Sequence, residues 1–453
     1  MCVLSATDAA AADVVSSHET SCVIVGGGPA GLVLALLLAR RGVSVTLLEA
    51  HADFDRDFRG DTLHPGILEM LDQLGLAEGV HELPHVKWYG PSLVTRRGVV
   101  PLMDFSRLAT RFPYIMVMPQ HQFLGFLAAE LAQYPHFRLL MRARVQELVV
   151  EDGIVRGVRY HEGNGDAWHE VRASLTVGAD GRFSRVRQLA DIEAVVVSDP
   201  MELLWFRLPR LDDDAEHFDS VSALVREKPL AVLNGERGSA VGFVNRGDGF
   251  LLAMFNRIDH WQVAYIYPAG TYQQLKAAGL DAFRQSIVDL EPRLVRHVAS
   301  LTNWRDLAPL SVAFSRCRKW YKPGLLLIGD AAHVMTPAAG AGIKYAIEDA
   351  VETANVAAGP LLAGSLVVED LARVQRRREW PTRVIQRVAS FQQRTVLARA
   401  LRAGKRAELP AGPPLLARIL LKIPLLRDLP AYFIAFGVRR VRVEDTSDVA
   451  LRR

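Results

Sequence analysis

Residues 21–50, SCVIVGGGPAGLVLALLLARRGVSVTLLEA, constrain the fold of this chain more than any other stretch. The apolar run before the glycines predicts a buried parallel strand, which a helix and a second strand follow. Gly26, Gly28 and Gly31 supply the pattern G-x-G-x-x-G between strand and helix. The first glycine permits a tight turn, the second lets a pyrophosphate approach the backbone, and the third lets helix and strand pack closely.

The helix begins with Pro29 and Ala30, and its unpaired N–H groups and positive dipole end favour phosphate groups. Glu49 ends the second strand, where a carboxylate can accept hydrogen bonds from ribose hydroxyls. In this strand–turn–helix–strand context the pattern predicts a dinucleotide site rather than a plain buried helix. It does not distinguish FAD from NAD.

The composition excludes several classes of protein. With 453 residues, half of them apolar, the chain is long enough for two or three packed domains. Cys2, Cys22 and Cys317 form no CxxC pair, which argues against a disulfide framework or a zinc site and fits a reducing cytoplasm. The net charge is +4, and the arginine-rich residues 373–387 predict a solvated helix face rather than a nucleic-acid surface.

Neither the apolar runs nor the first residues predict membrane insertion. The longest apolar run, which starts at Val23, is broken by glycines and a proline and does not predict a membrane span. Residues 1–19 lack the basic start and apolar core of a signal peptide. They predict a flexible N-terminal tail.

Two further stretches place acids directly after apolar strands. Residues 175–190, LTVGADGRFSRVRQLA, run from a strand into Asp180 and continue as a short helix. Residues 325–350, LLLIGDAAHVMTPAAGAGIKYAIEDA, run from a strand into Asp330, then through a loop of small residues into a helix. Because such a loop carries no large side chains, a flat ligand can approach its backbone closely.

In this order, the glycine pattern, D-G-x-x-S-x-x-R and G-D-A-A-H-x-x-x-P resemble the FAD-dependent aromatic hydroxylases of the p-hydroxybenzoate hydroxylase type. The resemblance covers roughly residues 20 to 355. It implies FAD as cofactor and NADH or NADPH as electron donor. It also implies that O2 adds to the reduced flavin as a C4a-hydroperoxide, which hydroxylates an aromatic or other electron-rich small molecule.

The resemblance implies a role for individual residues. Glu49 would hold the adenosine ribose, Arg59 would lie near the pyrophosphate, and Gln120 would face the ribityl chain and flavin. Asp180 would lie at the floor of the cleft that serves FAD and the nicotinamide donor, and Asp330 would accept from a ribityl hydroxyl. The implied cofactor-binding residues are Gly26, Gly28, Pro29, Ala30, Gly31, Glu49, Arg59, Gln120, Asp180, Gly329, Asp330, Gly340, Ala341, Gly342 and Ile343.

Three residues of these motifs can also be interpreted without a role in cofactor binding or catalysis. Asp180 could only cap the helix that follows it, since aspartate is a favoured N-cap residue. Arg59 could be an ordinary surface arginine. His333, in the third motif, is interpreted as a hydrogen-bonded supporting residue and not as a catalytic base.

The third motif departs from the related enzymes at Lys344. The resemblance implies that Pro337 sits beside the flavin ring, on the catalytic side. The loop over residues 338–342 would pass over the flavin, with the following helix pointing its N-terminus at the N1–C2=O edge. The relatives usually have asparagine where this chain has Lys344. Two hypotheses follow: Lys344 pairs with the reduced flavin edge, as a catalytic residue, or it turns outward to solvent.

The predicted fold class is α/β, with a Rossmann-like FAD-binding domain, an inserted antiparallel β-sheet substrate domain and a helical C-terminal region. The Asp152-Gly153 pair predicts a hairpin turn. Aromatic and basic strand residues are the candidates to line the substrate cavity, with ordinary core packing as the alternative: Trp205, Arg207, Phe243, Tyr265 and Tyr267. The predicted domain boundaries are 20–85, 115–190 and 305–355 for FAD, 86–114 and 191–304 for substrate, and 356–453 for the C-terminal region.

The C-terminal residues 414–443 are apolar and basic. Peripheral membrane contact is one interpretation; packing on the flavin domain or a dimer partner is favoured because related enzymes have similar tails, and the chain could be a monomer or a homodimer. Two other functions remain open: a flavin-dependent reductase of an isoprenoid-like substrate, and a protein that binds FAD and a ligand without turnover. No metal and no nucleic-acid partner is predicted.

Overall fold

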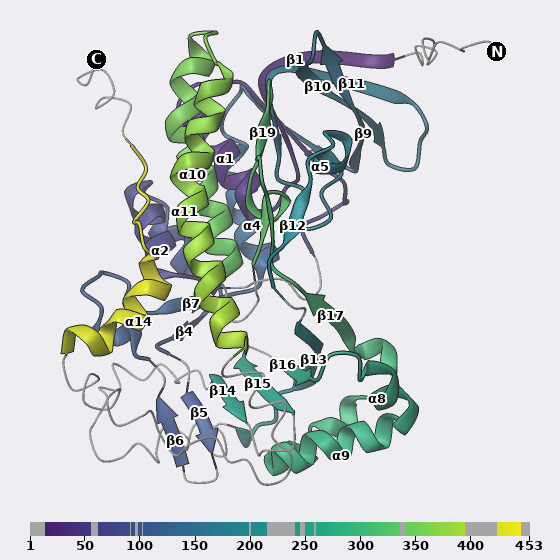
Figure 1. The fold of residues 1–453 in the computed structure, drawn as a ribbon, viewed down its shortest axis with the longest axis vertical. Coiled ribbons are helices and arrows are strands. Elements are labelled where there is room, and N and C mark those ends of the chain that lie inside the picture. Colours follow the sequence, from purple (N-terminus) through teal and green to yellow (C-terminus); the bar gives the residue numbers. More distant parts are fainter. Residues whose placement is uncertain are drawn as a thin grey trace.

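In the computed structural model the two largest β-sheets lie at opposite ends, and two long helices lie alongside the first (Figure 1). The lower sheet is flanked by α8 (Tyr272–Ala278) and α9 (Leu280–Leu290). The structure describes residues 14–55, 62–90, 92–95, 98–101, 103–198, 201–214, 241–244, 250–257, 260–335, 341–394 and 424–444.

The first sheet has the strand order β19-β20-β11-β1-β2-β8, with β10 and β9 attached beside β11. The pairs β1–β2, β1–β11, β2–β8 and β11–β20 are parallel. The inner part of β1 and all of β2 are buried, as continuous apolar runs in a parallel sheet require. The strands are β1 (Val14–Val25), β2 (Val45–Glu49), β8 (Phe137–Met141), β9 (Ala143–Glu151), β10 (Ile154–Glu162), β11 (Trp168–Gly178), β19 (Tyr321–Lys322) and β20 (Leu325–Leu327).

Two sequence-based predictions concern strands of this sheet, and one of them is confirmed. The hairpin between β9 and β10 is confirmed: Asp152 and Gly153 both have positive φ, 50° and 75°, as a tight two-residue turn between twisted strands demands. The prediction of a flexible tail over residues 1–19 is wrong for residues 14–19. They form the outer half of β1 and pair with the first half of β11, so backbone hydrogen bonds order a segment with little apolar character.

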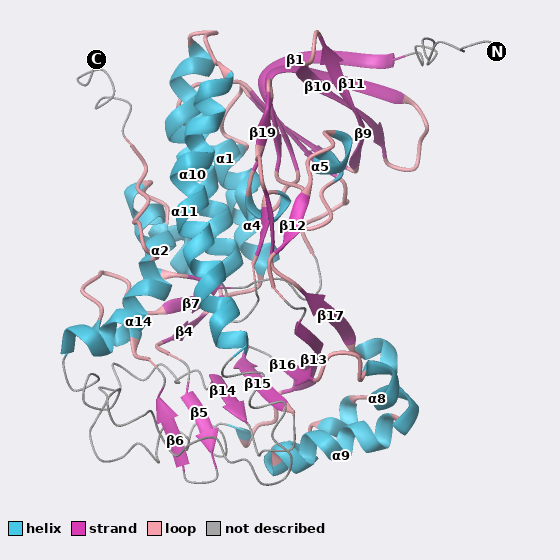
Figure 2. Ribbon diagram, viewed as in Figure 1, coloured by secondary structure: helices cyan, strands magenta, loops and turns pink. Residues whose placement is uncertain are grey.

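Helices cover this sheet, as Figure 2 shows. In α1 every residue from Ala30 to Ala39 is buried, because the helix lies among the sheet, α10 and α4. This all-round burial explains the absence of a polar face. The helices here are α1 (Pro29–Arg40), α2 (Pro65–Gln73), α3 (Ala77–Glu82), α4 (Gln120–Leu131), α5 (Arg185–Leu189), α10 (Ala341–Leu362) and α11 (Val368–Gln392). Within the described ranges, no helix is long and apolar enough to cross a membrane.

The second sheet has the order β17-β13-β16-β15-β14-β5-β6. Its neighbours pair antiparallel, as predicted, except that β14 and β5 are parallel. β17 was expected in the FAD domain, but it is an edge strand of this sheet. Its strands are β5 (Ser92–Thr95), β6 (Gly98–Pro101), β13 (Met201–Pro209), β14 (Val241–Val244), β15 (Leu251–Asn256), β16 (His260–Tyr267) and β17 (Ala308–Val312).

One face of the second sheet packs on α8 (Tyr272–Ala278) and α9 (Leu280–Leu290). Beside this core, Trp261 Nε1 donates to Asp214 Oδ2 at 2.7 Å, and His297 Nε2 lies 2.8 Å from Asp214 Oδ1. All three side chains are buried. Asp214, which follows β13, therefore links the chain after that strand to Trp261 of β16 and to His297. 

Short strands and a C-terminal helix connect the two sheets. Ala431 and Ala435 of α14 (Pro424–Phe436) pack with Trp88 and Phe105. The connecting strands are β3 (Thr62–Leu63), β4 (Val86–Trp88), β7 (Ile115–Val117), β12 (Ala194–Val196), β18 (Ser315–Cys317) and β21 (His333–Val334).

Candidate active site

The glycine turn lies between the carboxyl end of β1 and the start of α1. Gly26 has a φ of +108°, and a Cβ there would lie 2.5 Å from the carbonyl oxygen of Ala179. A Cβ on Gly31 would lie 2.0 Å from the carbonyl oxygen of Gly26. A Cβ on Gly28 would meet no described atom within 4 Å. Two glycines are thus required by the turn itself, and the third leaves an open cradle that fits a pyrophosphate.

The predicted phosphate and ribose residues surround this turn. Pro29 is the first residue of α1, followed by the buried Ala30. Glu49 is buried, and its Oε2 accepts a hydrogen bond from Gly27 N at 2.8 Å. Its Oε1 accepts from His51 N at 2.9 Å and lies 2.7 Å from His51 Nδ1. Since each carboxylate oxygen has further acceptor capacity, Glu49 can support the turn and still receive a ribose hydroxyl.

We expect Glu49→Gln to weaken FAD binding about tenfold while leaving the fold intact. The amide oxygen can still accept from Gly27 N, but the amide NH2 faces the His51 donors and cannot accept from a ribose. Titration of the apoprotein with FAD, followed by flavin fluorescence, measures the change. An unchanged dissociation constant would place the ribose elsewhere.

Three motifs that are far apart in the sequence meet at this point. Arg187, after the loop at Asp180, donates from Nη1 to the carbonyl oxygen of Ala331 at 2.9 Å. A Cβ on Gly329 would lie 3.5 Å from the Cβ of Ala30. The loop at Asp180, the loop at Asp330 and the start of α1 therefore lie next to one another, as a single extended cofactor requires.

The plainer alternative for Asp180 is only partly right, because the N-cap residue of α5 is Ser184, whose Oγ accepts from Arg187 N at 2.9 Å. Asp180 supports this cap: its Oδ2 accepts from Val186 N at 3.0 Å, and Ser184 Oγ donates to its Oδ1 at 2.5 Å. Desolvation raises the pKa of Asp180, although the hydrogen bonds from Ser184 and the backbone oppose the shift. A role toward FAD or the nicotinamide donor would be added to this capping and stays a prediction.

The third motif turns sharply before α10. Gly329 has a φ of +58°, a conformation that favours glycine, and Asp330 follows it partly buried. Ala341, Gly342 and Ile343 open α10, so this part of the loop leads directly into the first helical turn. Three of the predicted residues lie outside the described part of the chain: Arg59, Pro337 and Gly340.

Lys344 does not turn outward, so that hypothesis is wrong. Its side chain is only 1% exposed, its Nζ lies 2.8 Å from Glu348 Oε1 and it stacks 4.5 Å from the ring centre of Tyr345. A Cβ on Gly437, just after α14, would come within 2.9 Å of Nζ. Burial lowers the pKa of Lys344, and the charge of Glu348 opposes that shift. The partner one helical turn along accounts for a lysine at this helix start.

A buried charged cluster that no sequence pattern predicted lies beside this motif. Arg378 donates from Nε to Asp349 Oδ1 at 2.7 Å and from Nη2 to Glu348 Oε2 at 2.8 Å. Arg378 is fully buried, so the expectation that residues 373–387 form a solvated face is wrong at this position. His333 Nε2 lies 2.6 Å from Asp349 Oδ2, which confirms His333 as a hydrogen-bonded supporting residue.

The predicted cavity-lining aromatic residues divide between the two faces of the second sheet. Trp205 lies on the face away from α9, with its ring 5.7 Å from that of Phe255. Tyr265 and Tyr267 lie on the opposite face, in the core with α9. Their expected place in the cavity is therefore wrong: the core interpretation holds, because neighbouring strands put Tyr265 and Trp205 on opposite sides of the pleat.

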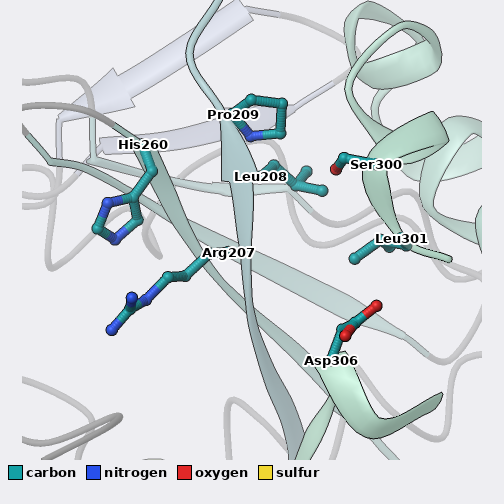
Figure 3. A pocket seen from close by; sticks show the side chains of 7 residues that line it. All are labelled: Arg207, Leu208, Pro209, His260, Ser300, Leu301 and Asp306. Carbon is teal, nitrogen blue, oxygen red and sulfur yellow. The ribbon is translucent and has the colours of Figure 1, made fainter. Parts of the chain in front are cut away.

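The remaining predicted residues lie at the edges of these elements. Gln120 is the first residue of α4 and is partly buried. Phe243 pairs with Ala253 in the β14–β15 ladder, and its side chain lies outside the described part. Arg207 lines a cavity of about 400 Å³ at the end of β13, where it and His260 project to one side of the strand (Figure 3). The other side of that cavity is formed by Ser300, Leu301 and Asp306.

Comparison with known proteins identifies the family. Residues 19–379 match the model of the FAD binding domain family. The chain is 33% identical over 388 residues to 6-methylpretetramide 4-monooxygenase of Streptomyces rimosus, covering 84% of this chain and 85% of that enzyme. It is 25% identical over 345 residues to para-nitrophenol 4-monooxygenase of a Pseudomonas species, covering 74% and 76%. A p-nitrophenol 4-monooxygenase structure from Pseudomonas putida superposes with a TM-score of 0.68 at 20% identity, covering 94% and 100%.

The three converging motifs and the open glycine cradle define a flavoprotein, and the chain belongs to the FAD binding domain family. Within that family it is an FAD-dependent monooxygenase of the aromatic hydroxylase group, which uses NAD(P)H and O2. The predicted family, fold class, cofactor and reaction type are confirmed. The reductase and non-catalytic alternatives are not favoured.

Proposed function

We propose that this monooxygenase hydroxylates an uncharged, multi-ring aromatic compound of the polyketide type. The observation that carries the proposal is the apolar face of the second sheet. The residues that form this face are Leu203, Trp205, Leu251, Ala253, Phe255, Ala264, Ile266 and Leu310. Phe255 also packs against the cluster formed with α14, and a Cβ on Gly437, just beyond α14, would lie 2.9 Å from Nζ of Lys344 in α10. In this proposal the apolar face is the wall of the substrate site, and such a wall would suit several fused rings better than one carboxylated ring.

The relatives are consistent with this substrate class. The 33% identical enzyme is named for a 6-methylpretetramide substrate, and another relative, from Streptomyces rimosus, is named for 12-dehydrotetracycline and anhydrotetracycline. A nitrophenol-type substrate, as in the second relative, is the competing proposal.

Bound FAD supplies the redox chemistry: NAD(P)H, a proton and O2 convert an aromatic C–H into C–OH and release NAD(P)+ and water. The chain's own residues bind, orient and exclude water. The glycine turn would hold the pyrophosphate, and Glu49 and Asp330 would accept hydrogen bonds from hydroxyls of the cofactor. Peptide N–H groups at the start of α10 would stabilise negative charge at the cofactor's edge. The apolar sheet face would keep the ring dry and oriented.

The same proposal includes a cytoplasmic location and a monomer or homodimer. Cys22 and Cys317, the cysteines within the described part, are buried and not bonded to each other, which suits a reducing compartment.

The test compares three ligands on the FAD-loaded enzyme: a hydroxylated naphthacenecarboxamide, p-nitrophenol and p-hydroxybenzoate. We expect the multi-ring ligand to give a kcat/KM at least about tenfold higher than either single-ring ligand, because more apolar surface is bound. NAD(P)H consumption, oxygen uptake and incorporation of one ¹⁸O atom from ¹⁸O2 should agree. A higher kcat/KM for p-nitrophenol would favour the competing proposal, and one for p-hydroxybenzoate would overturn both.

A further inference from the structure

A row of buried charged and polar side chains connects α10, α11 and the loop after β20. It consists of Lys344, Glu348, Arg378, Asp349 and His333, here called the Arg378 cluster. None of the five is more than 6% exposed. Two cations and two carboxylates lie in the row, and Arg378 lies at its centre, bonded to both carboxylates.

The cluster reaches both ends of the loop proposed to contact FAD. At one end, Asp349 Oδ2 accepts a hydrogen bond from the backbone N–H of Gly329 at 3.0 Å. Gly329 immediately precedes Asp330 and has the left-handed φ that turns the chain there. At the other end, Glu348 Oε1 holds Lys344, in the first turn of α10, at 2.8 Å. One side chain of α11, Arg378, is therefore bonded to the two carboxylates that contact Gly329 and Lys344.

The geometry of Asp349 distinguishes this arrangement from simple helix packing. Its Oδ1 faces Arg378, while its Oδ2 faces Gly329 and His333. Because the two oxygens are rigidly linked, the Arg378 contact sets where the second oxygen meets the loop backbone. Burying four charges is costly and is not in itself a stabilising device. What these contacts can provide is a fixed position for the backbone at Gly329 and for the first turn of α10.

We propose that Arg378 is a positioning residue for FAD, acting through Asp349 and Glu348 on the two ends of residues 329–344. The proposal rests on the proposed placement of FAD against this loop. Arg378 itself need not touch the cofactor. Its planar fork holds the two carboxylates in a fixed relative position, which the single, freely rotating ammonium of a lysine does not.

The decisive variant is Arg378→Lys, which keeps the charge and loses the fork. We expect FAD to bind about tenfold more weakly or worse, as happens when outer-shell partners of metal ligands are removed. The visible circular dichroism of the bound flavin should change as well. Asp349→Asn, which leaves Arg378 paired with Glu348, should give the same two effects and replaces the first variant if that does not fold.

Two controls separate the possible failures. Asp214→Asn disrupts a buried polar cluster in the other sheet, so it should lower the melting temperature of the apoprotein and leave FAD affinity unchanged. If Arg378→Lys and Asp349→Asn behave like Asp214→Asn, the positioning role is overturned. The variant Asp330→Ala tests whether FAD contacts the loop. Normal FAD affinity in Asp330→Ala would mean that the placement of FAD is wrong. Weak FAD binding in Asp330→Ala together with normal binding in Arg378→Lys would overturn only the positioning role of Arg378.

Discussion

Gly31→Ala is expected to prevent the first βαβ unit from forming in its present geometry. The added Cβ would lie 2.0 Å from the carbonyl oxygen of Gly26, and that atom belongs to the turn itself. No side chain can rotate away to make room, so strand and helix must separate. We expect a loss of at least about 3 kcal/mol in the free energy of unfolding, the upper range for overpacked sites. Soluble yield, the melting temperature of the apoprotein and bound FAD per chain should all fall.

Gly28→Ala is the matched control because its Cβ enters the open cradle. No described atom lies within 4 Å of that Cβ, so the apoprotein should lose at most about 1 kcal/mol, the range seen for N-cap substitutions. FAD affinity should nevertheless fall, since the methyl group occupies the space through which a pyrophosphate would approach the backbone. Wild-type FAD affinity in Gly28→Ala would show that the pyrophosphate does not bind here.

Arg378→Met is expected to have the second large effect, on stability and on its dependence on pH. The change leaves Glu348 and Asp349 buried without the cation that pairs with both. Breaking a buried pair in this way typically costs about 3 to 5 kcal/mol. Denaturant unfolding at pH 7.5 measures the loss. Arg377→Met on the same helix also removes an arginine from a buried carboxylate, Glu352, but Arg377 is partly exposed and Arg439 stays 3.9 Å from Glu352. This control should therefore cost less than Arg378→Met.

The stability lost in Arg378→Met should depend on pH through Asp349. Burial alone would raise the pKa of Asp349, but the charges of His333 and Arg378 and their hydrogen bonds outweigh it and hold the pKa below its usual range. The stabilisation by ionised Asp349 is therefore complete above its unfolded pKa and is lost only as pH falls through the lower, folded value. Without Arg378 one of the two positive partners that lower the pKa of Asp349 is lost, while His333 stays, so the folded-state pKa of Asp349 should rise. The difference in stability between variant and wild type should therefore shrink as pH falls through the raised folded-state pKa of the variant. A difference that stays constant as the pH is lowered to the unfolding limit of the protein would overturn this prediction.

Much of the cofactor side could be predicted from sequence because its signals are local. The glycine turn, the acid at Glu49 and the Asp152-Gly153 hairpin each follow from backbone requirements of a few adjacent residues. The burial of Arg378 left a weaker signal: Leu371, Val374 and Arg378 are spaced by three and four, which places the arginine on the apolar face of its helix. The many arginines in residues 373–387 favoured the interpretation as a solvated face, although this spacing was present.

The environment of the second sheet could not be predicted in the same way. Alternation along β13 and β16 tells which residues share a face, but not whether that face meets a helix or the cofactor. Trp205 and Tyr265 are equally plausible cavity residues until α9 is placed. The surroundings of Lys344 could be predicted only in part. Glu348 lies one helical turn later in the sequence and is a predictable partner. The closeness of Gly437 to Nζ, by contrast, depends on where α14 packs, which the local sequence does not indicate.

The strand order of the first sheet has a consequence for synthesis on the ribosome. β1 is made first, but its neighbours are β2 and β11, and β11 needs β20 beyond residue 320. The glycine turn is therefore translated long before the strand that completes its surroundings, and Arg378 of α11 follows later still. Nascent chains stalled before α11 should fail to retain FAD, so cofactor capture would have to wait until α11 has left the ribosome.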